Sequence, residues 1–105
     1  MLNTVHGYTA SQSLVDGPSK KDLREGRAAA QNIVPSSTGA AIAVTLAYPE
    51  LKGLFDGISI RVPVPAGSIV DVTFISKKPT TAEEVNAILK KAAGEDRWKN
   101  IFTVT

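Results

Sequence analysis

The chain has 105 residues, of which 43% are hydrophobic and 21% charged, so it is too apolar for a disordered segment and long enough for one domain at most. Its net charge of +2 comes from acids and bases that are mixed along the chain, which argues against a nucleic-acid partner. It has no cysteine, which suits a reducing compartment, and no apolar run near the roughly 20 residues of a membrane span. We therefore expect a soluble, unexported protein that binds neither nucleic acid nor membrane.

The first predicted element is a strand over residues 2–8, and its period of two places Thr4, His6 and Tyr8 on one face. No helical or strand period lasts from Thr9 to Ser37, so this stretch is predicted to be a loop of nearly thirty residues. Such long connections are usually functional, disordered or stabilised by something outside the domain.

A helix follows over residues 40–48, where the run is apolar on nearly every face and ends before Pro49. This composition predicts a buried helix. Three hydroxyl residues precede it and can cap its first turn, namely Ser36, Ser37 and Thr38.

Two strands are expected next, over residues 58–62 and 68–76, and we expect the second to run antiparallel to the first. In the first of them Arg61 alternates with apolar residues, so its side chain is predicted to point away from the apolar face. The last element is a helix that begins at the capping box of Thr81 and Glu84 and ends at Gly94. The order predicts an α+β fold, a mostly antiparallel or mixed sheet with helices on one face.

His6 is the only histidine and the first candidate for chemistry, because an imidazole can both take and give a proton at neutral pH. A hydrogen-bonded structural histidine is the alternative. No serine lies in a G-x-S-x-G elbow, and one histidine without cysteine makes a protein-only metal site unexpected.

Two positions can hold an anion. The helix start at "SSTGAA" offers unpaired backbone N–H groups and close approach at Gly39, although simple N-capping also explains its hydroxyls. Arg61 can bind a phosphate in bidentate fashion or be a solvated surface residue. The mixed charges of the loop, Lys20, Lys21, Arg24 and Arg27 with Asp22 and Glu25 among them, are interpreted as a solvated or subunit-facing set.

Five stretches, "TVHGYTASQ", "VDGPSKKDLREGR", "AAQNIVPSSTGAA", "PELKGLFDGISIRVPVP" and "GSIVDVTF", together resemble consecutive blocks of the catalytic domain of phosphorylating glyceraldehyde-3-phosphate dehydrogenases. The resemblance covers nearly the whole chain and implies that residues 1–105 are part of that C-terminal-type domain. In the family, a dinucleotide-binding domain and the nucleophilic cysteine precede these blocks. Further strands and a long C-terminal helix follow them.

The resemblance also implies roles for single residues. His6 matches the histidine that activates the cysteine thiol and assists proton transfer. Thr9 and Arg61 match ligands of the substrate's C3 phosphate, and Thr38 with Gly39 matches the site of the attacking inorganic phosphate.

Other matches are looser. Arg24 lies where the family often has an arginine that borders these sites, and Ser11 stands where many members have threonine. Residues 10–37 resemble the S-shaped loop that packs at a subunit interface, in which Pro18 matches a position associated with preference for NAD. "PVPAG" replaces the commoner "PTPNV" without removing a phosphate ligand.

The resemblance thus implies a segment of a cytoplasmic, homo-oligomeric, NAD-dependent oxidoreductase of glycolysis. The intact enzyme would convert glyceraldehyde 3-phosphate and phosphate to 1,3-bisphosphoglycerate through a cysteine thioester. The isolated chain is expected to be inactive, because it has neither nucleophile nor hydride acceptor. Two alternatives remain open: a non-enzymatic anion-binding or assembly module, and a fragment of an erythrose-4-phosphate dehydrogenase.

Overall fold

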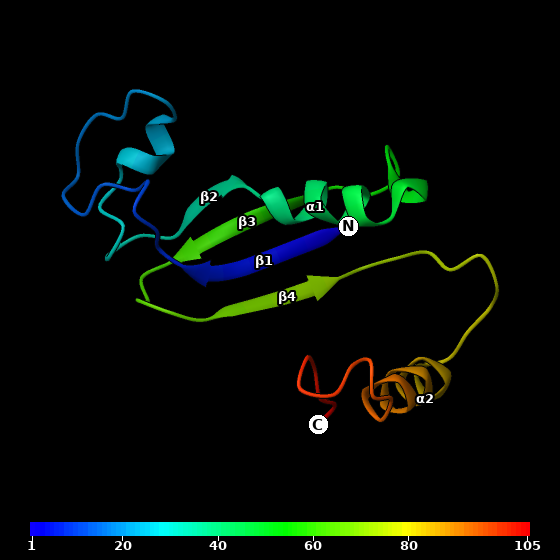
Figure 1. The fold of residues 1–105 in the computed structure, drawn as a ribbon. Coiled ribbons are helices and arrows are strands. Elements are labelled where there is room, and N and C mark those ends of the chain that lie inside the picture. The colour runs from blue at the N-terminus through cyan, green and yellow to red at the C-terminus, as the bar shows by residue number, and fades with distance from the viewer. The chain divides into compact units, whose positions relative to one another are not determined.

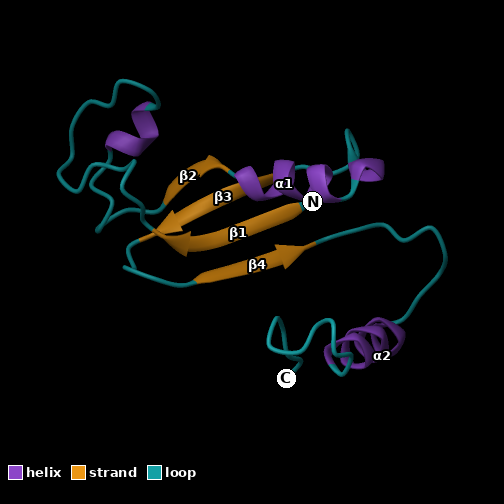
Figure 2. Cartoon of the chain, viewed as in Figure 1, coloured by secondary structure: helices purple, strands orange, loops and turns teal.

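A computed structural model describes all of residues 1–105, which fold as two compact units, residues 1–74 and residues 75–105. The first unit is built on a four-stranded sheet, and the second contains one α-helix and a C-terminal turn (Figures 1 and 2). Neither α-helix is long and apolar enough to cross a membrane.

The sheet has the order β2-β3-β1-β4 and is mixed. The central strand β1 (Leu2–Gly7) runs parallel to β3 (Gly57–Val62) and antiparallel to β4 (Ser68–Val72). The remaining strand, β2 (Val34–Ser37), pairs antiparallel with β3 at the opposite edge (Figure 1). The predicted α+β class with a mixed sheet is confirmed.

Two details of the sheet differ from the sequence prediction. The strand predicted over residues 68–76 ends at Val72. It runs antiparallel to β3 as predicted, but β1 lies between the two strands and is the one that β4 pairs with. The connection over residues 63–67 crosses β1, and the N–H of Gly7 donates to the carbonyl of Gly67 at 3.1 Å. Two prolines in five residues prevent the tight hairpin that direct pairing would need.

The other difference is β2, which lies at the end of the stretch predicted to be a loop. Its sequence, VPSS, contains a proline and two hydroxyl residues, a composition typical of turns. Pro35 is tolerated because β2 is an edge strand, where one side of the backbone needs no ladder hydrogen bond.

The long segment between β1 and β2 is folded on itself, with one 3₁₀ turn, η1 (Leu23–Gly26) (Figure 2). Backbone hydrogen bonds of 2.9 Å join Ser13 to both Glu25 and Ala29, and another joins Gly17 to Gly26. Ala29 is 1% exposed, so the segment has a small interior of its own. The loop is therefore ordered by contacts within this chain.

Gly26 is expected to be the position of this loop that is most sensitive to substitution. A Cβ atom there would lie 2.1 Å from the carbonyl oxygen of Gly17, because the two backbone segments are in direct contact. Gly26→Ala should lower the free energy of unfolding by about 1–3 kcal/mol in urea denaturation. Gly39→Ala is the matched control, since a Cβ at Gly39 meets nothing within 4 Å. Equal stability of the two variants would contradict this packing.

Helix α1 (Gly39–Ala47) begins as predicted, because the Thr38 hydroxyl oxygen accepts a hydrogen bond from the N–H of Ala40 at 3.2 Å. The prediction that this helix is buried is wrong for this chain. Ala41 is its only buried residue, and Ile42 and Leu46 are 65% and 78% exposed. Most of its large apolar side chains are therefore exposed. A 3₁₀ turn, η2 (Pro49–Leu51), follows it.

In the second unit, α2 (Ala82–Ala93) has the predicted capping box between Thr81 and Glu84 and ends at Gly94. After the helix, Trp98 packs edge-on against Phe102, with ring centroids 5.9 Å apart. The guanidinium of Arg97 lies 4.9 Å from the Trp98 ring centre, which adds a cation–π contact.

Candidate functional site

One face of the sheet carries a group of polar side chains from three adjacent strands. Residues directly opposite each other in paired strands share a face, and the register sets His6 opposite Arg61, Thr4 opposite Ser59, and Ser36 opposite Ser59. We call this group the polar face; its members are Thr4, His6, Ser36, Ser59 and Arg61. Three of them are buried, with Ser59 only 1% exposed.

His6 is held through both ring nitrogens. Its Nδ1 contacts the carbonyl oxygen of Gly7, and its Nε2 lies 2.7 Å from the hydroxyl oxygen of Ser59. A carbonyl oxygen can only accept, so we assign the proton of the neutral ring to Nδ1. Nε2 then accepts from Ser59 and is the nitrogen that can take a further proton.

Arg61 lies beside His6 and is occupied by two groups from the long loop. Its Nη1 donates to the hydroxyl of Ser11 at 2.8 Å and forms an ion pair with Oε1 of Glu25 at 3.1 Å. Both charged side chains are mostly buried, at 13% and 16% exposed. The Nε of Arg61 is buried without a hydrogen-bond partner.

Thr9 joins this cluster through Ser11. The hydroxyl oxygens of Thr9 and Ser11 are 3.2 Å apart, and the backbone N–H of Thr9 donates to the side-chain oxygen of Gln12 at 3.0 Å. Thr9 also borders a cavity of about 300 Å³ together with Tyr8, Ala10, Gln12 and Leu14. The structure therefore brings together three of the predicted site residues, Thr9, Ser11 and Arg61, next to His6.

Thr38 and Gly39 lie elsewhere along the sheet. Arg61 is opposite Val34 at the beginning of β2, while Thr38 follows Ser37 at its end. Ser37 comes three positions after Val34 along the strand, which is a rise of about 10 Å. The two predicted anion positions are thus separated by the length of β2. Gly39 has open space around it, and the Thr38 hydroxyl caps α1.

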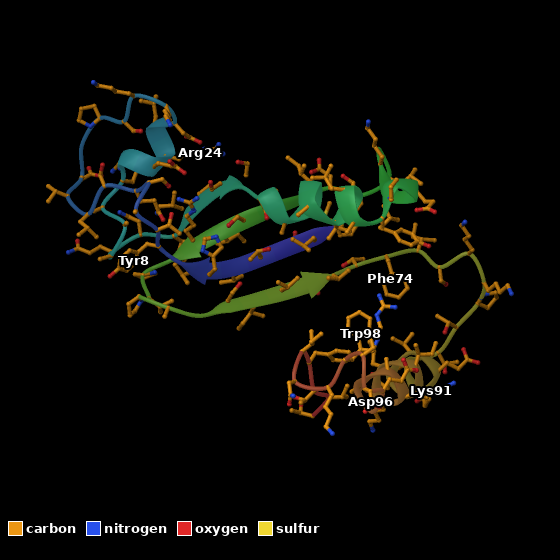
Figure 3. All side chains as sticks on the ribbon, viewed as in Figure 1. Tyr8, Arg24, Phe74, Lys91, Asp96 and Trp98 are labelled. Atoms are coloured by element: carbon orange, nitrogen blue, oxygen red, sulfur yellow. The ribbon has the colours of Figure 1, made fainter.

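Arg24 projects from η1 (Figure 3) and is bound to Asp22, not to the polar face. Its Nε and Nη2 donate to the Asp22 carboxylate at 2.7–3.1 Å. Hydrogen bonds from the Arg24 side chain and then from its backbone N–H hold the pKa of Asp22 below its ordinary value. The pair is therefore formed at neutral pH and is lost as the pH falls through that lowered pKa.

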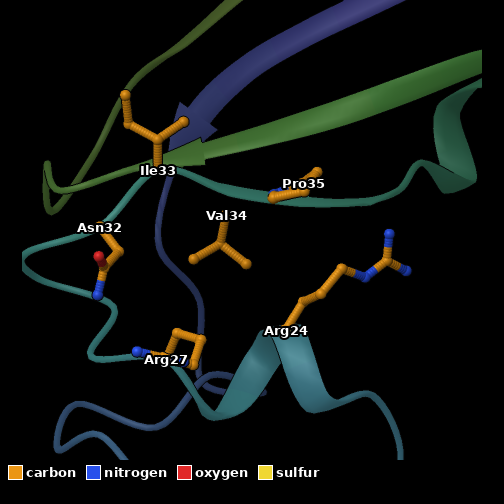
Figure 4. A pocket seen from close by; sticks show the side chains of 6 residues that line it. All are labelled: Arg24, Arg27, Asn32, Ile33, Val34 and Pro35. Atoms are coloured by element: carbon orange, nitrogen blue, oxygen red, sulfur yellow. The ribbon is translucent and has the colours of Figure 1, made fainter.

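Arg24 also lines a cavity of about 160 Å³ with Arg27 and residues at the start of β2 (Figure 4). The remaining lining residues are Asn32, Ile33, Val34 and Pro35. Arg27 forms an exposed ion pair of 2.7 Å with Asp16, so both guanidinium groups at this cavity already have a carboxylate partner. Pro18 is exposed in the same loop.

Two members of the site were not singled out from the sequence. Ser59 was only a polar position in an alternating strand, and its contact with His6 depends on the register between β1 and β3. Glu25 was one of several mixed charges, and nothing local distinguishes it from its exposed neighbours. Only the path of the loop over the sheet identifies it.

Over residues 1–105 the chain matches the protein family described as "Glyceraldehyde 3-phosphate dehydrogenase, C-terminal domain". It is 54% identical over 102 residues to a glyceraldehyde-3-phosphate dehydrogenase of Mycobacterium avium, covering 97% of this chain and 30% of that protein. It is 57% identical to glyceraldehyde-3-phosphate dehydrogenase 1 of Trichormus variabilis, covering 89% of this chain and 27% of the relative. A relative from Echinococcus multilocularis is 50% identical over the whole chain and 31% of its own length. The chain spans about a third of the length of these relatives or slightly less.

Proposed function

Because this chain belongs to the family of glyceraldehyde 3-phosphate dehydrogenase C-terminal domains, we propose that it is a segment of a glycolytic, NAD-dependent dehydrogenase. The proposed reaction converts glyceraldehyde 3-phosphate and inorganic phosphate to 1,3-bisphosphoglycerate through a thioester on a cysteine, in the cytoplasm. The observation that carries the proposal is the placement of His6 and Arg61 opposite each other on one face of the sheet. A proton acceptor and a phosphate-binding cation are then within reach of one small substrate.

His6 is proposed to act as the general base. With the Nδ1 proton held by the Gly7 carbonyl, Nε2 has the lone pair that can take a proton from a thiol. The same nitrogen then returns a proton as the reaction proceeds. Ser59 keeps the ring in place while no thiol is present, since its hydroxyl can donate to neutral imidazole and accept from imidazolium.

Arg61 and Thr9 are proposed to hold the substrate's C3 phosphate, and Thr38 with Gly39 the attacking phosphate. The cluster of Arg61, Ser11 and Thr9 supports the first assignment, because it combines a cation with two hydroxyls beside a cavity. The capped helix start at Thr38, with open space at Gly39, supports the second. About 10 Å of strand between them leaves room for two separate anions.

Pro18, the residue that the resemblance places near the NAD cofactor, is exposed. NAD would accept the hydride from the substrate when bound. Its site is proposed to lie mainly in a separate dinucleotide-binding domain, as in the family.

The proposed function is tested by a chimaera in which this chain replaces the matching 102 residues of the Mycobacterium avium relative. We expect the chimaera to reduce NAD when it is supplied with glyceraldehyde 3-phosphate and phosphate. The 105-residue chain alone, which has no cysteine, should give no turnover in the same assay. A folded but inactive chimaera would contradict the proposal, as would NADH formation by the chain alone.

A second candidate, an assembly module, is favoured by the exposed edge of the sheet. β4 is an edge strand, and Ile69, Val72 and Phe74 at and beyond it are 72%, 49% and 60% exposed. An uncovered apolar edge strand pairs readily with another chain. Light scattering should then show a homo-oligomer of the isolated chain, and a well-folded monomer would count against this candidate.

A further inference from the structure

The ion pair between Arg61 and Glu25 differs from the other two in this chain. The pairs Arg24–Asp22 and Arg27–Asp16 join residues of the loop, and their side chains are 31–65% exposed. The pair of Arg61 and Glu25 joins the loop to the sheet and is 13% and 16% exposed. Salt and water screen a largely buried ion pair less than an exposed one. Removing either partner therefore leaves the other charge poorly solvated and destabilises the fold.

Glu25 is delivered to this position by well-defined backbone contacts. Its N–H donates to the carbonyl of Asp22 at 3.0 Å, and its carbonyl accepts from Ser13 at 2.9 Å. Its Oε1 is also 3.5 Å from the hydroxyl of Ser36 on β2. The 3₁₀ turn η1 therefore holds the carboxylate of Glu25 over the polar face, because the backbone of Glu25 is fixed by these hydrogen bonds.

The contact uses only part of the guanidinium. Glu25 and Ser11 both bind Nη1, while Nε is buried and has no partner. A carboxylate that contacts one nitrogen neutralises the charge without filling the paired donors that favour a bidentate anion. Arg61 thus has hydrogen-bonding capacity that Glu25 does not fill. A phosphate reaches Nε only when the groups that cover it move, and it must then lie next to the negative charge of Glu25.

We propose that Glu25 is a specificity-determining residue of the anion site at Arg61. Its carboxylate is a counter-ion of Arg61 within the chain. A phosphate that binds Arg61 must either displace this carboxylate or bind beside it, where the two negative charges repel each other. Free inorganic phosphate gains only the contacts of the phosphate group, so Glu25 weakens its binding. A phosphorylated aldehyde gains further contacts through its carbon chain and overcomes this repulsion. The inference rests on the phosphate-binding role proposed above for Arg61.

The test uses the 105-residue chain and inorganic phosphate as the probe, with binding followed by NMR at the guanidinium of Arg61. Glu25→Gln keeps the shape of the side chain but removes the charge, and it should tighten phosphate binding by about tenfold or more. Glu50→Gln is the matched control, because it makes the same change in net charge at an exposed glutamate in η2. It should leave the affinity unchanged within about twofold.

A measurement on the unaltered chain covers the case in which Glu25→Gln fails to fold. Phosphate that displaces or crowds Glu25 must shift the ¹³C resonance of its carboxyl carbon during the titration. If the Glu25 resonance does not shift during the titration, the inference about Glu25 is wrong. The same holds if phosphate binds in an Arg61-dependent way but Glu25→Gln does not tighten that binding. Either result leaves the proposed role of Arg61 standing. Phosphate binding that persists in Arg61→Gln would instead overturn the proposed role of Arg61, and with it the premise of the inference.

Discussion

Replacing His6 with asparagine in the active chimaera is expected to lower kcat by about 100- to 10,000-fold, the range typical of losing a general base. Asparagine can keep a hydrogen bond to Ser59 but cannot take a proton from a thiol. The loss should shrink at alkaline pH, because the cysteine then ionises without help. Stopped-flow measurement of NADH formation between neutral and alkaline pH gives both the fall in kcat and its dependence on pH.

Ser59→Ala is the control for His6→Asn. It removes one hydrogen bond from Nε2 but leaves the imidazole and the contact of Nδ1 with Gly7. One hydrogen bond accounts for a fall of no more than about tenfold in kcat. If kcat of the His6→Asn variant falls no further than kcat of the Ser59→Ala variant, His6 has a structural role only. The same conclusion follows if kcat of His6→Asn does not recover at high pH.

Replacing Arg61 with glutamine should have the largest effect on stability of any single charge removal in the chain. It leaves the carboxylate of Glu25, which is 16% exposed, without its cation. Leaving one charge of this largely buried pair without its partner should lower the free energy of unfolding by about 1–3 kcal/mol, whereas an exposed pair contributes about 0–1 kcal/mol. Urea denaturation of the 105-residue chain measures the difference.

Arg27→Gln is the matched control, since it breaks the pair with Asp16, whose side chains are 65% and 54% exposed. The double variant Arg61→Gln with Glu25→Gln should recover part of the stability lost in Arg61→Gln, because no unpaired charge is left. Equal destabilisation by Arg61→Gln and Arg27→Gln would mean that the buried pair contributes no more than a surface pair.

The parts of the fold that the sequence predicts well depend on near neighbours. The cap of α1 by Thr38 and the capping box of α2 involve residues two or three positions apart. The strand face that carries His6 follows from the period of two within β1. Such features can be inferred locally because their geometry is set within a single turn or strand.

The features that were missed depend on pairing between distant segments. Without the register of β1 with β3, nothing indicates that Ser59 meets His6. The pairing of β4 with β1 depends on a crossing connection that no local pattern predicts. Glu25 reaches Arg61 only because the long loop returns over β2 and β3.

The burial of α1 was predicted wrongly for a different reason. Its composition is that of a core helix, yet Ile42 and Leu46 are largely exposed in this chain. An apolar sequence predicts that a helix surface will pack against another apolar surface. It does not predict which segment or chain provides that second surface.

The central claim is that His6 and Arg61 border one anion-binding site, and a phosphate titration of the 105-residue chain followed by ¹⁵N NMR tests it most directly. The ring nitrogens of His6 and the Nε of Arg61 should shift together and give the same dissociation constant. Shifts at Arg61 alone, or at neither residue, would contradict the claim that the two side chains share a site.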